Sequence, residues 1–406
     1  MNYRLTACAV LAALSTATLP TAAVAHDDRP PRYIAYEIPA PELVDPLCVP
    51  GYATSQFGTD LNNRRFLAGG AGCYHQDGVD ANGRPFYQRH YQPYAWSPPT
   101  GSYLLPRNGT GDALPLGVDV FNNAYGYDGS NGLDGAKWTP GGGLELIFGA
   151  DPFCGFGFSI ALRANVRGEA IGWAFRPVPE GFCNIRWVLR KPDGIEVVGP
   201  VGGTPAAINA AGLVAGNIDN RAAKWNSHTG EVTFLRPATD TDLTGVLDMN
   251  ERGVSVGAAA VVESNGPPIC RRVKPILWDA RNRERALPML PGSVASNTYG
   301  INEDGDIVGD ATPSACNDGA SEMQRAVIWT GNRVTDLNRQ LIGRPGIVLL
   351  TTSAINDRGE IMAFGYRAWE PEKPCPQTLL PPDGGLPTSD DSTCHDTRAY
   401  LLVPVN

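Results

Sequence analysis

A nine-residue pattern that recurs seven times constrains the fold of this chain more than any other feature. In its clearest copy, residues 301–309, an apolar residue precedes Asn, two polar residues and Gly, and a second Gly follows four residues later. An Asn-x-x-Gly sequence between apolar runs favours a tight turn, because Asn bonds to nearby backbone and Gly tolerates positive φ. Each copy therefore predicts a turn that leads into a short strand. The Asn residues assigned to the seven copies are Asn62, Asn122, Asn165, Asn209, Asn250, Asn302 and Asn356.

A second element, a short apolar strand that ends in Trp, follows each copy, and residues 325–329 are typical of it. Its apolar residues are consecutive rather than alternating, which is typical of a strand covered on both faces. Units of about 40 to 50 residues with four short strands are typical of propeller blades. Seven units predict an all-β fold, a seven-bladed β-propeller. The residues assigned to the ends of these strands are Trp96, Trp138, Trp187, Trp225, Trp278, Trp329 and, in the last copy, Leu402.

Composition excludes the other fold classes. The 406 residues include 47 Gly and 35 Pro, the two least favourable residues in helix interiors, so the chain is not mostly helical. A hydrophobic fraction of 42% is enough for a packed core and excludes a disordered chain.

The two ends of the repeat region predict how the ring closes. Residues 32–38 form an apolar strand before the first copy, and residues 398–405 end the last copy with no strand after them. We expect the first strand to complete the last blade, which leaves no open seam. A linear solenoid is the alternative, but it needs polar caps, and these ends are apolar.

The repeated Asn-x-x-Gly turn and the Ala-x-x-Trp strand resemble the HAF family of extracellular repeats from exported bacterial proteins. The resemblance covers roughly residues 55–405, but the His-Ala-Phe that names the family is replaced, for example by Arg-Ala-Val at residues 325–327. This is typical of a divergent member. The resemblance implies export and a repetitive β fold, and it provides no catalytic residues to transfer.

Residues 1–25 have the features of a secretory signal peptide. Arg4 precedes a small apolar run at residues 5–19, and Ala-Val-Ala at residues 23–25 is a cleavage sequence. The run is shorter than the about 20 residues that a membrane span needs. We therefore expect residues 26–406 to form one exported domain, extracellular or periplasmic, without a membrane span.

The cysteines after residue 25 predict disulfide bonds, because an even number in an exported chain favours pairing. Eight cysteines allow 105 pairings, and their spacing favours bonds between sequence neighbours. No Cys-x-x-Cys or Cys-x-x-His sequence supports a metal site instead. The expected pairs are Cys48–Cys73, Cys154–Cys183, Cys270–Cys316 and Cys375–Cys394.

Charge and motifs exclude several functions. With 33 basic and 42 acidic residues, a net charge of −9 makes nucleic acid a poor partner. The sequence has no H-E-x-x-H, G-x-S-x-G or P-loop motif, so no catalytic residue is assigned. His75, His90 and Asp77 or Asp80 are one candidate metal site, but solvated loop histidines are the preferred interpretation, so we predict no metal and no cofactor.

Three residues outside the repeat are candidates for ligand binding. Trp173, Arg176 and Trp369 combine aromatic and guanidinium groups, which sugar and peptide sites often use, although strand packing is the preferred interpretation of the tryptophans. Residues 73–92 and 370–398 also depart from the repeat and are interpreted as long surface loops, which are often functional.

These features favour an exported, non-catalytic scaffold that binds an extracellular or periplasmic protein, a glycan or a small ligand. The alternative is an extracellular hydrolase or lyase that acts on a polysaccharide or small ligand at the central face. A third hypothesis is surface adhesion through the disulfide-tethered loops. If several of His75, His90, the carboxylates and Arg176 meet in the central funnel with perturbed titration, the enzyme is favoured, and a position on the rim favours the scaffold.

Overall fold

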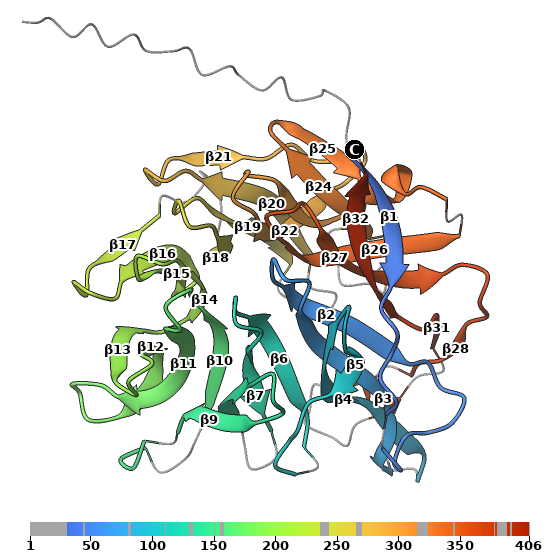
Figure 1. The fold of residues 1–406 in the computed structure, drawn as a ribbon, viewed down its shortest axis with the longest axis horizontal. Coiled ribbons are helices and arrows are strands. Elements are labelled where there is room, and N and C mark those ends of the chain that lie inside the picture. Colours follow the sequence, from blue (N-terminus) through green and yellow to red (C-terminus); the bar gives the residue numbers. More distant parts are fainter. Residues whose placement is uncertain are drawn as a thin grey trace, which may run out of the picture. The chain divides into compact units, whose positions relative to one another are not determined.

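The chain folds into seven antiparallel sheets of four strands that stand around a common centre (Figure 1). This is the predicted seven-bladed β-propeller, and no α-helix occurs in the described residues. No helix in this part of the chain has the length and apolar character needed to cross a bilayer. The computed structural model describes residues 31–43, 45–79, 83–109, 111–129, 133–149, 151–154, 158–235, 243–264, 270–314, 324–343, 346–376, 378–379, 388–389 and 392–405.

The first four blades follow one another along the chain, each from its innermost strand outward. Blade 1 comprises β2 (Ser55–Leu61), β3 (Leu67–Val79), β4 (Pro85–Ser97) and β5 (Gly101–Leu104). Blade 2 comprises β6 (Ala113–Val118), β7 (Ala124–Asp128), β8 (Asp134–Trp138) and β9 (Leu144–Phe148). Blade 3 comprises β10 (Ser159–Ala164), β11 (Ala170–Pro177), β12 (Cys183–Arg190) and β13 (Glu196–Val201). Blade 4 comprises β14 (Thr204–Ile208), β15 (Leu213–Ile218), β16 (Arg221–Asn226) and β17 (Val232–Phe234).

The last three blades complete the ring. Blade 5 comprises β18 (Leu243–Met249), β19 (Ser255–Ser264), β20 (Cys270–Trp278) and β21 (Glu284–Ala286). Blade 6 comprises β22 (Ala295–Ile301), β23 (Ile307–Thr312), β24 (Arg325–Thr330) and β25 (Arg333–Asp336), and the 3-10 helix η2 (Leu337–Gln340) follows it. Blade 7 comprises β26 (Ile347–Ile355), β27 (Ile361–Arg367), β32 (Arg398–Val405) and β1 (Arg32–Glu37).

Strand β1 closes the ring, as predicted. It pairs antiparallel with β32 from Arg32 opposite Val405 to Glu37 opposite Tyr400, and Figure 1 shows the two strands side by side. Four charged side chains reinforce this seam. Arg367 donates to Glu37 at 2.6 Å and to Glu370 at 2.8 Å. Arg398 donates to the same two carboxylates, at 2.7 Å to Glu370 and 3.3 Å to Glu37. The outermost strand is therefore held by side chains as well as by its backbone.

The Asn-x-x-Gly pattern forms the turn between the first and second strand of a blade. In blade 7, Oδ1 of Asn356 accepts the backbone N–H groups of Arg358 and Glu360, each at 3.0 Å. The Gly three residues after the Asn has positive φ, 68° at Gly359. The predicted turn chemistry is therefore confirmed.

The second Gly of the pattern is required for a different reason, which is close approach of two backbones. Each innermost strand contains a register shift shortly before its Asn, such as the one between Val246 and Asp248 in β18. There its backbone passes close to the neighbouring strand. A Cβ atom on Gly257 would lie 1.9 Å from the carbonyl oxygen of Gly245. In blade 7 the corresponding residue is Ala363, and the close approach lies instead at Gly365, 1.8 Å from the oxygen of Val348.

Two residues of the repeat were assigned wrongly from the sequence. In blade 2 the turn is capped by Asp119, not Asn122, because Oδ1 of Asp119 accepts the N–H groups of Phe121 and Asn123 at 2.8 Å. A carboxylate oxygen caps this turn as an amide oxygen does, and Asn122 takes the place of the Gly, with φ 66°.

The other wrong assignment lies in blade 3. In the other blades the Trp or its equivalent pairs with the residue five positions after the turn-capping Asn or Asp, as Trp329 does with Ile307. In blade 3 the equivalent of the Trp is Arg190, which pairs with Ala170, and Trp187 lies three residues earlier.

The hydrophobic core lies between neighbouring blades. One cluster joins Val256 of blade 5 to Ile307 and Trp329 of blade 6. Trp329 is fully buried, and its Nε1 donates to the carbonyl of Pro288 at 2.7 Å. Trp138, Trp187 and Trp278 are no more than 1% exposed, so the predicted packing role of these tryptophans is confirmed. Each blade therefore covers the apolar face of the next.

Three of the four predicted disulfides are present: Cys48–Cys73, Cys154–Cys183 and Cys375–Cys394. Cys316 lies outside the described residues, so its bond to Cys270 stays a prediction, as does the signal peptide at residues 1–25. Residues 73–92 were expected to form a loop, and this was wrong, because 73–79 and 85–92 extend β3 and β4 into a long hairpin. In residues 370–398 the structure describes the short pairs β28 (Lys373–Pro374) with β31 (Thr393–Cys394) and β29 (Thr378–Leu379) with β30 (Thr388–Ser389).

Candidate functional site

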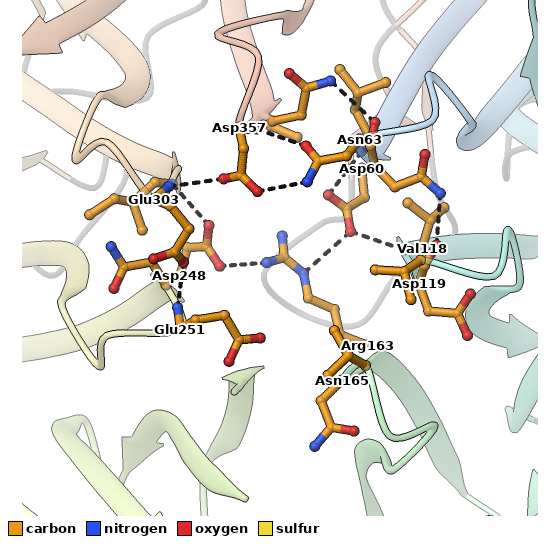
Figure 2. Close-up of a pocket in the computed structure, with 18 of the residues that line it drawn as sticks. Asp60, Asn63, Val118, Asp119, Arg163, Asn165, Asp248, Glu251, Glu303 and Asp357 are labelled. Carbon is orange, nitrogen blue, oxygen red and sulfur yellow. Dashed lines mark hydrogen bonds and ion pairs between the residues drawn. The ribbon is translucent and has the colours of Figure 1, made fainter. Parts of the chain in front are cut away.

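The ends of the seven innermost strands surround a central cavity of about 200 Å³ (Figure 2). All seven blades contribute to its lining, because each inner strand ends there in its Asn turn. The charged residues that line it are Asp60, Asp119, Arg163, Asp248, Glu251, Glu303 and Asp357. Six carboxyl groups and one guanidinium therefore line the centre of the ring.

An ion-pair network crosses the cavity, with Asp60 and Asp248 buried and Arg163 half-buried. Arg163 at the end of β10 donates to Asp248 of β18 at 2.5 Å, and its Nε lies 3.6 Å from Asp60 of β2 (Figure 2). Burial lowers the pKa of the Arg163 guanidinium, but the charges of Asp248 and Asp60 raise it by more. The net pKa is therefore above its usual value, and the group stays charged. Burial raises the pKa of the Asp248 carboxyl, against the opposing effect of Arg163.

The same two aspartates also connect neighbouring blades. Asp60 Oδ2 accepts the backbone N–H of Val118 in the next blade at 2.9 Å. Asp248 Oδ2 accepts the N–H of Ile301 in the next blade, also at 2.9 Å. The carboxylate oxygens of Asp60 and Asp248 are thus bonded to backbone N–H groups and to Arg163, so both residues have a structural role.

The Asn side chains form an amide belt around the cavity. Each Nδ2 donates to backbone in the turn of the next blade, for example Asn165 to Asn209 O at 3.0 Å and Asn250 to Asn302 O at 3.1 Å. The belt crosses the closure of the ring through Asn356, which donates to Asn62 O at 3.2 Å. It is interrupted where Asp119 replaces Asn, because a carboxylate cannot donate.

A second belt uses the residue after each Asn. Backbone N–H groups donate to the side chain of the next blade: Ala210 to Glu251 at 2.6 Å, Glu251 to Glu303 at 2.6 Å and Glu303 to Asp357 at 3.0 Å. Asp357 and Asn63 then bond reciprocally, at 2.8 and 2.6 Å (Figure 2). These carboxylates therefore fix the order and spacing of blades 4 to 7 and blade 1.

Sequence reasoning assigned the Asn residues a structural role but did not find the charged network. The signal was present at two repeat positions. The residue two before the Asn is Asp60, Arg163 or Asp248 in three blades and Gly or Ala in the other four, and the residue after the Asn is acidic in blades 5 to 7. Aligning the copies and reading these columns would have shown a charged centre.

The histidines and Arg176 lie away from the central cavity. His75 and His90 belong to the β3–β4 hairpin, where their rings stack with centroids 4.2 Å apart. Arg176 in β11 is bound by both oxygens of Glu196 in β13, at 2.7 and 3.0 Å. Of the groups named from the sequence, His75, His90 and Arg176 therefore do not meet at the centre, whereas carboxylates do line the central cavity.

The three candidate ligand residues occupy two blades. Trp173 lies in β11 opposite Trp187 and contacts Phe158, with ring centroids 5.6 Å apart. Trp369 follows β27 in blade 7, is 60% exposed and lies beside Arg367, 5.7 Å from the ring centroid. The structure therefore brings Trp173 and Arg176 onto one strand and leaves Trp369 elsewhere.

The two non-repeat stretches pack against each other and form what we call the side module: residues 45–54, 73–79, 83–92, 372–376 and 392–396. Tyr74 and Cys375 share a small buried cluster, with Tyr52 and Tyr87 packed against it. The backbone N–H of Ala53 donates to Pro374 O at 2.9 Å. Two of the disulfides, Cys48–Cys73 and Cys375–Cys394, lie in this module.

A scan against models of known protein families and a search of curated protein sequences both find no match to this chain. Among solved structures, the chain is similar to a streptogramin B lyase, with TM-score 0.47 and 11% identity over 92% of this chain and 98% of that one. It is also similar to an acylaminoacyl peptidase of Pyrococcus horikoshii, with TM-score 0.48 and 8% identity, over 79% of this chain and only 51% of the peptidase. A gluconolactonase from Xanthomonas campestris has TM-score 0.38 and 10% identity, over 71% and 97% of the two chains.

Proposed function

We propose that this chain is an exported, non-catalytic binding scaffold that recognises its partner through the side module. The observation that supports this most directly is the packing of the two non-repeat stretches onto each other, each with its own disulfide. These stretches lie outside the repeat, although residues 73–79 and 85–92 continue β3 and β4 of blade 1. A segment outside the repeat that is held in place by a disulfide has the properties of a binding loop.

The central cavity supports a structural role rather than catalysis. Its volume of about 200 Å³ is below the roughly 300–1,000 Å³ typical of small-molecule sites. A general base needs a free carboxylate oxygen near a substrate proton. Asp60 and Asp248 direct their oxygens to backbone N–H groups and to Arg163 instead.

The side module contains aromatic and cationic groups around the buried ring of Tyr74, with Tyr52, Tyr87 and Arg89 half-buried beside it. Tyr52 lies between Tyr74 and Tyr87, at centroid distances of 5.9 and 5.0 Å. Arg89 lies over the Tyr74 ring at 4.7 Å and donates to its hydroxyl at 2.8 Å. Tyrosine and arginine are enriched at recognition surfaces. We infer that the partner is an extracellular or periplasmic protein or glycan with polar groups and flat apolar faces.

A pair of variants tests the location of binding. In the first, residues 376–393 are replaced by a short Gly-Ser linker, which keeps Cys375 and Cys394. In the second, Glu303→Gln removes a charge at the central cavity while its amide oxygen still accepts from Glu251. Binding of each purified protein to a glycan array and to isolated cell-envelope fractions is compared with wild type.

Loss of binding in the linker variant with retention in Glu303→Gln supports the proposal. The reverse result, or turnover of a polysaccharide by wild type that Glu303→Gln abolishes, would overturn it in favour of a central hydrolase or lyase.

Export and membership of the HAF-type repeat family complete the proposal. Three disulfides agree with an oxidising compartment. Sequencing the amino terminus of the exported protein tests the first point, with His26 as the expected first residue. A non-reducing peptide map tests the remaining Cys270–Cys316 bond.

A further inference from the structure

The stacked histidine pair of the β3–β4 hairpin lies among three carboxylates. His75 Nε2 is 3.2 Å from Asp45 Oδ2, and His90 Nε2 is 2.8 Å from Asp77 Oδ2. Ligand atoms of His75, Asp77 and His90 all lie within 4.8 Å of one another. We propose that these three residues bind a zinc ion, with Asp45 as a fourth ligand. This proposal does not depend on the proposed function.

The sheet register explains why the two histidines meet. Cys73 pairs with His90 and His75 pairs with Gln88, so the histidines are diagonal neighbours on one face of the hairpin. The Cys48–Cys73 bond anchors this face to the segment that carries Asp45. Ligands from three separate segments are thereby held in place, and the bonded cysteines offer no thiolate.

An unsatisfied nitrogen points to a missing partner. His75 is 8% exposed, and among the described residues its Nε2 has no hydrogen-bond partner, although the Asp45 oxygen is near. A buried polar atom without a partner is unfavourable, because it has lost its hydrogen bonds to water. Coordination of an ion by Nε2 would remove this cost and would use the nearby carboxylate at the same time.

The environment of His90 is that of a metal-binding histidine. Its Nε2 faces Asp77, and its Nδ1 lies 3.2 Å from Asp112 Oδ1, which also accepts the N–H of Tyr91 at 3.0 Å. Ligating histidines characteristically donate their other nitrogen to a carboxylate, which orients the ring and raises its basicity.

The ligand types favour zinc over calcium or magnesium. Two imidazole nitrogens with carboxylate oxygens suit Zn²⁺, whereas Ca²⁺ and Mg²⁺ take oxygen ligands. Zinc bonds of about 2.0–2.1 Å place neighbouring tetrahedral ligands roughly 3.3 Å apart, close to the His75–Asp45 and His90–Asp77 separations. The rings are stacked at 15°, so one imidazole must turn about its Cβ–Cγ bond to bring both nitrogens to one ion.

Calorimetry on untagged, EDTA-treated and non-reduced protein tests the site with ZnCl₂ and, as a comparison, MgCl₂. We expect one zinc per chain, no magnesium binding, and at least a tenfold loss of zinc affinity in His75→Gln and in His90→Gln. Asp112→Asn should weaken binding about tenfold through ring orientation. The exposed histidine variant His228→Gln is the matched control and should bind as wild type.

A readout that does not depend on the folding of variants keeps the test decisive. In wild type, zinc should shift the NMR signals of two histidine rings and raise the melting temperature. No binding at 1 mM zinc, or one zinc retained in the His75→Gln, His90→Gln double variant, would overturn the proposal.

Discussion

Arg163→Met removes the one cationic side chain among the described residues that line the central cavity, and it leaves two aspartates buried without a counter-charge. Met has nearly the length and volume of the Arg stem, so the change acts mainly on charge. Breaking a buried ion pair by removing one partner costs about 3–5 kcal/mol. Arg163 contacts Asp248 at 2.5 Å and Asp60 at 3.6 Å, so we expect a loss of unfolding free energy in this range at pH 8.

The penalty should shrink in acid. Burial already raises the pKa of Asp248, and loss of Arg163 raises it further. A carboxyl whose pKa is higher in the folded than in the unfolded state takes up its proton first in the folded state, so acid stabilises the variant relative to wild type. Each unit of additional pKa increase is worth about 1.4 kcal/mol. The difference between variant and wild type should therefore fall between pH 8 and pH 4.5.

Urea unfolding followed by tryptophan fluorescence at these two pH values measures the effect. Arg167→Met is the matched control, because this exposed Arg lies in the same turn and should change stability by less than about 0.5 kcal/mol. Combining Arg163→Met with Asp60→Asn and Asp248→Asn should recover most of the loss. An Arg163→Met protein within 1 kcal/mol of wild type at pH 8, or a penalty independent of pH, would refute the reasoning.

Three further changes test other parts of the ring. Gly257→Ala places a Cβ atom 1.9 Å from a backbone oxygen and should cost about 3 kcal/mol or more in thermal unfolding, whereas Gly141→Ala, with open space around it, should cost nothing. Asn302→Ala removes a turn cap and a belt hydrogen bond, which should cost about 2 kcal/mol in urea unfolding. Burial lowers the pKa of Lys224 to about 8, so between pH 8 and 10.5 the folded state loses a proton that the unfolded state keeps. Over this range the unfolding free energy of wild type should rise by up to about 3 kcal/mol relative to Lys224→Met, and equal pH profiles of stability would contradict this.

The architecture could be predicted because the turn of each blade needs particular residues. An Asn oxygen must cap two N–H groups, and the following left-handed residue favours Gly, so these letters recur and can be counted. The cap of blade 2 was not predicted, because there a carboxylate oxygen of Asp119 accepts the N–H groups of the turn. The nearest Asn, Asn122, was assigned to the cap instead. The prediction also failed in blade 3, where Trp187 fills the core from a different register than Trp329 does.

The sites could be predicted only in part, because their members are distant in sequence. His75, Asp77 and His90 were grouped as a metal candidate, but Asp45 and Asp112 come from other segments. Only the hairpin register and the disulfide bring them together. Arg163 contacts its two aspartates across the centre of the ring, and a local sequence pattern cannot predict which residues from different blades are in contact.

The pairing of β1 with β32 also determines when blade 7 can form. Arg32 lies opposite Val405, so this sheet needs two strands that the other six blades separate along the chain. Closing so long a loop carries an entropic cost of about 5 kcal/mol. Only the complete β1–β32 pairing offsets this cost. Because Arg32 and Val405 are paired in adjacent antiparallel strands, a short turn could join them as in a β-hairpin. A circularly permuted chain that begins at another blade could then form the same seven sheets.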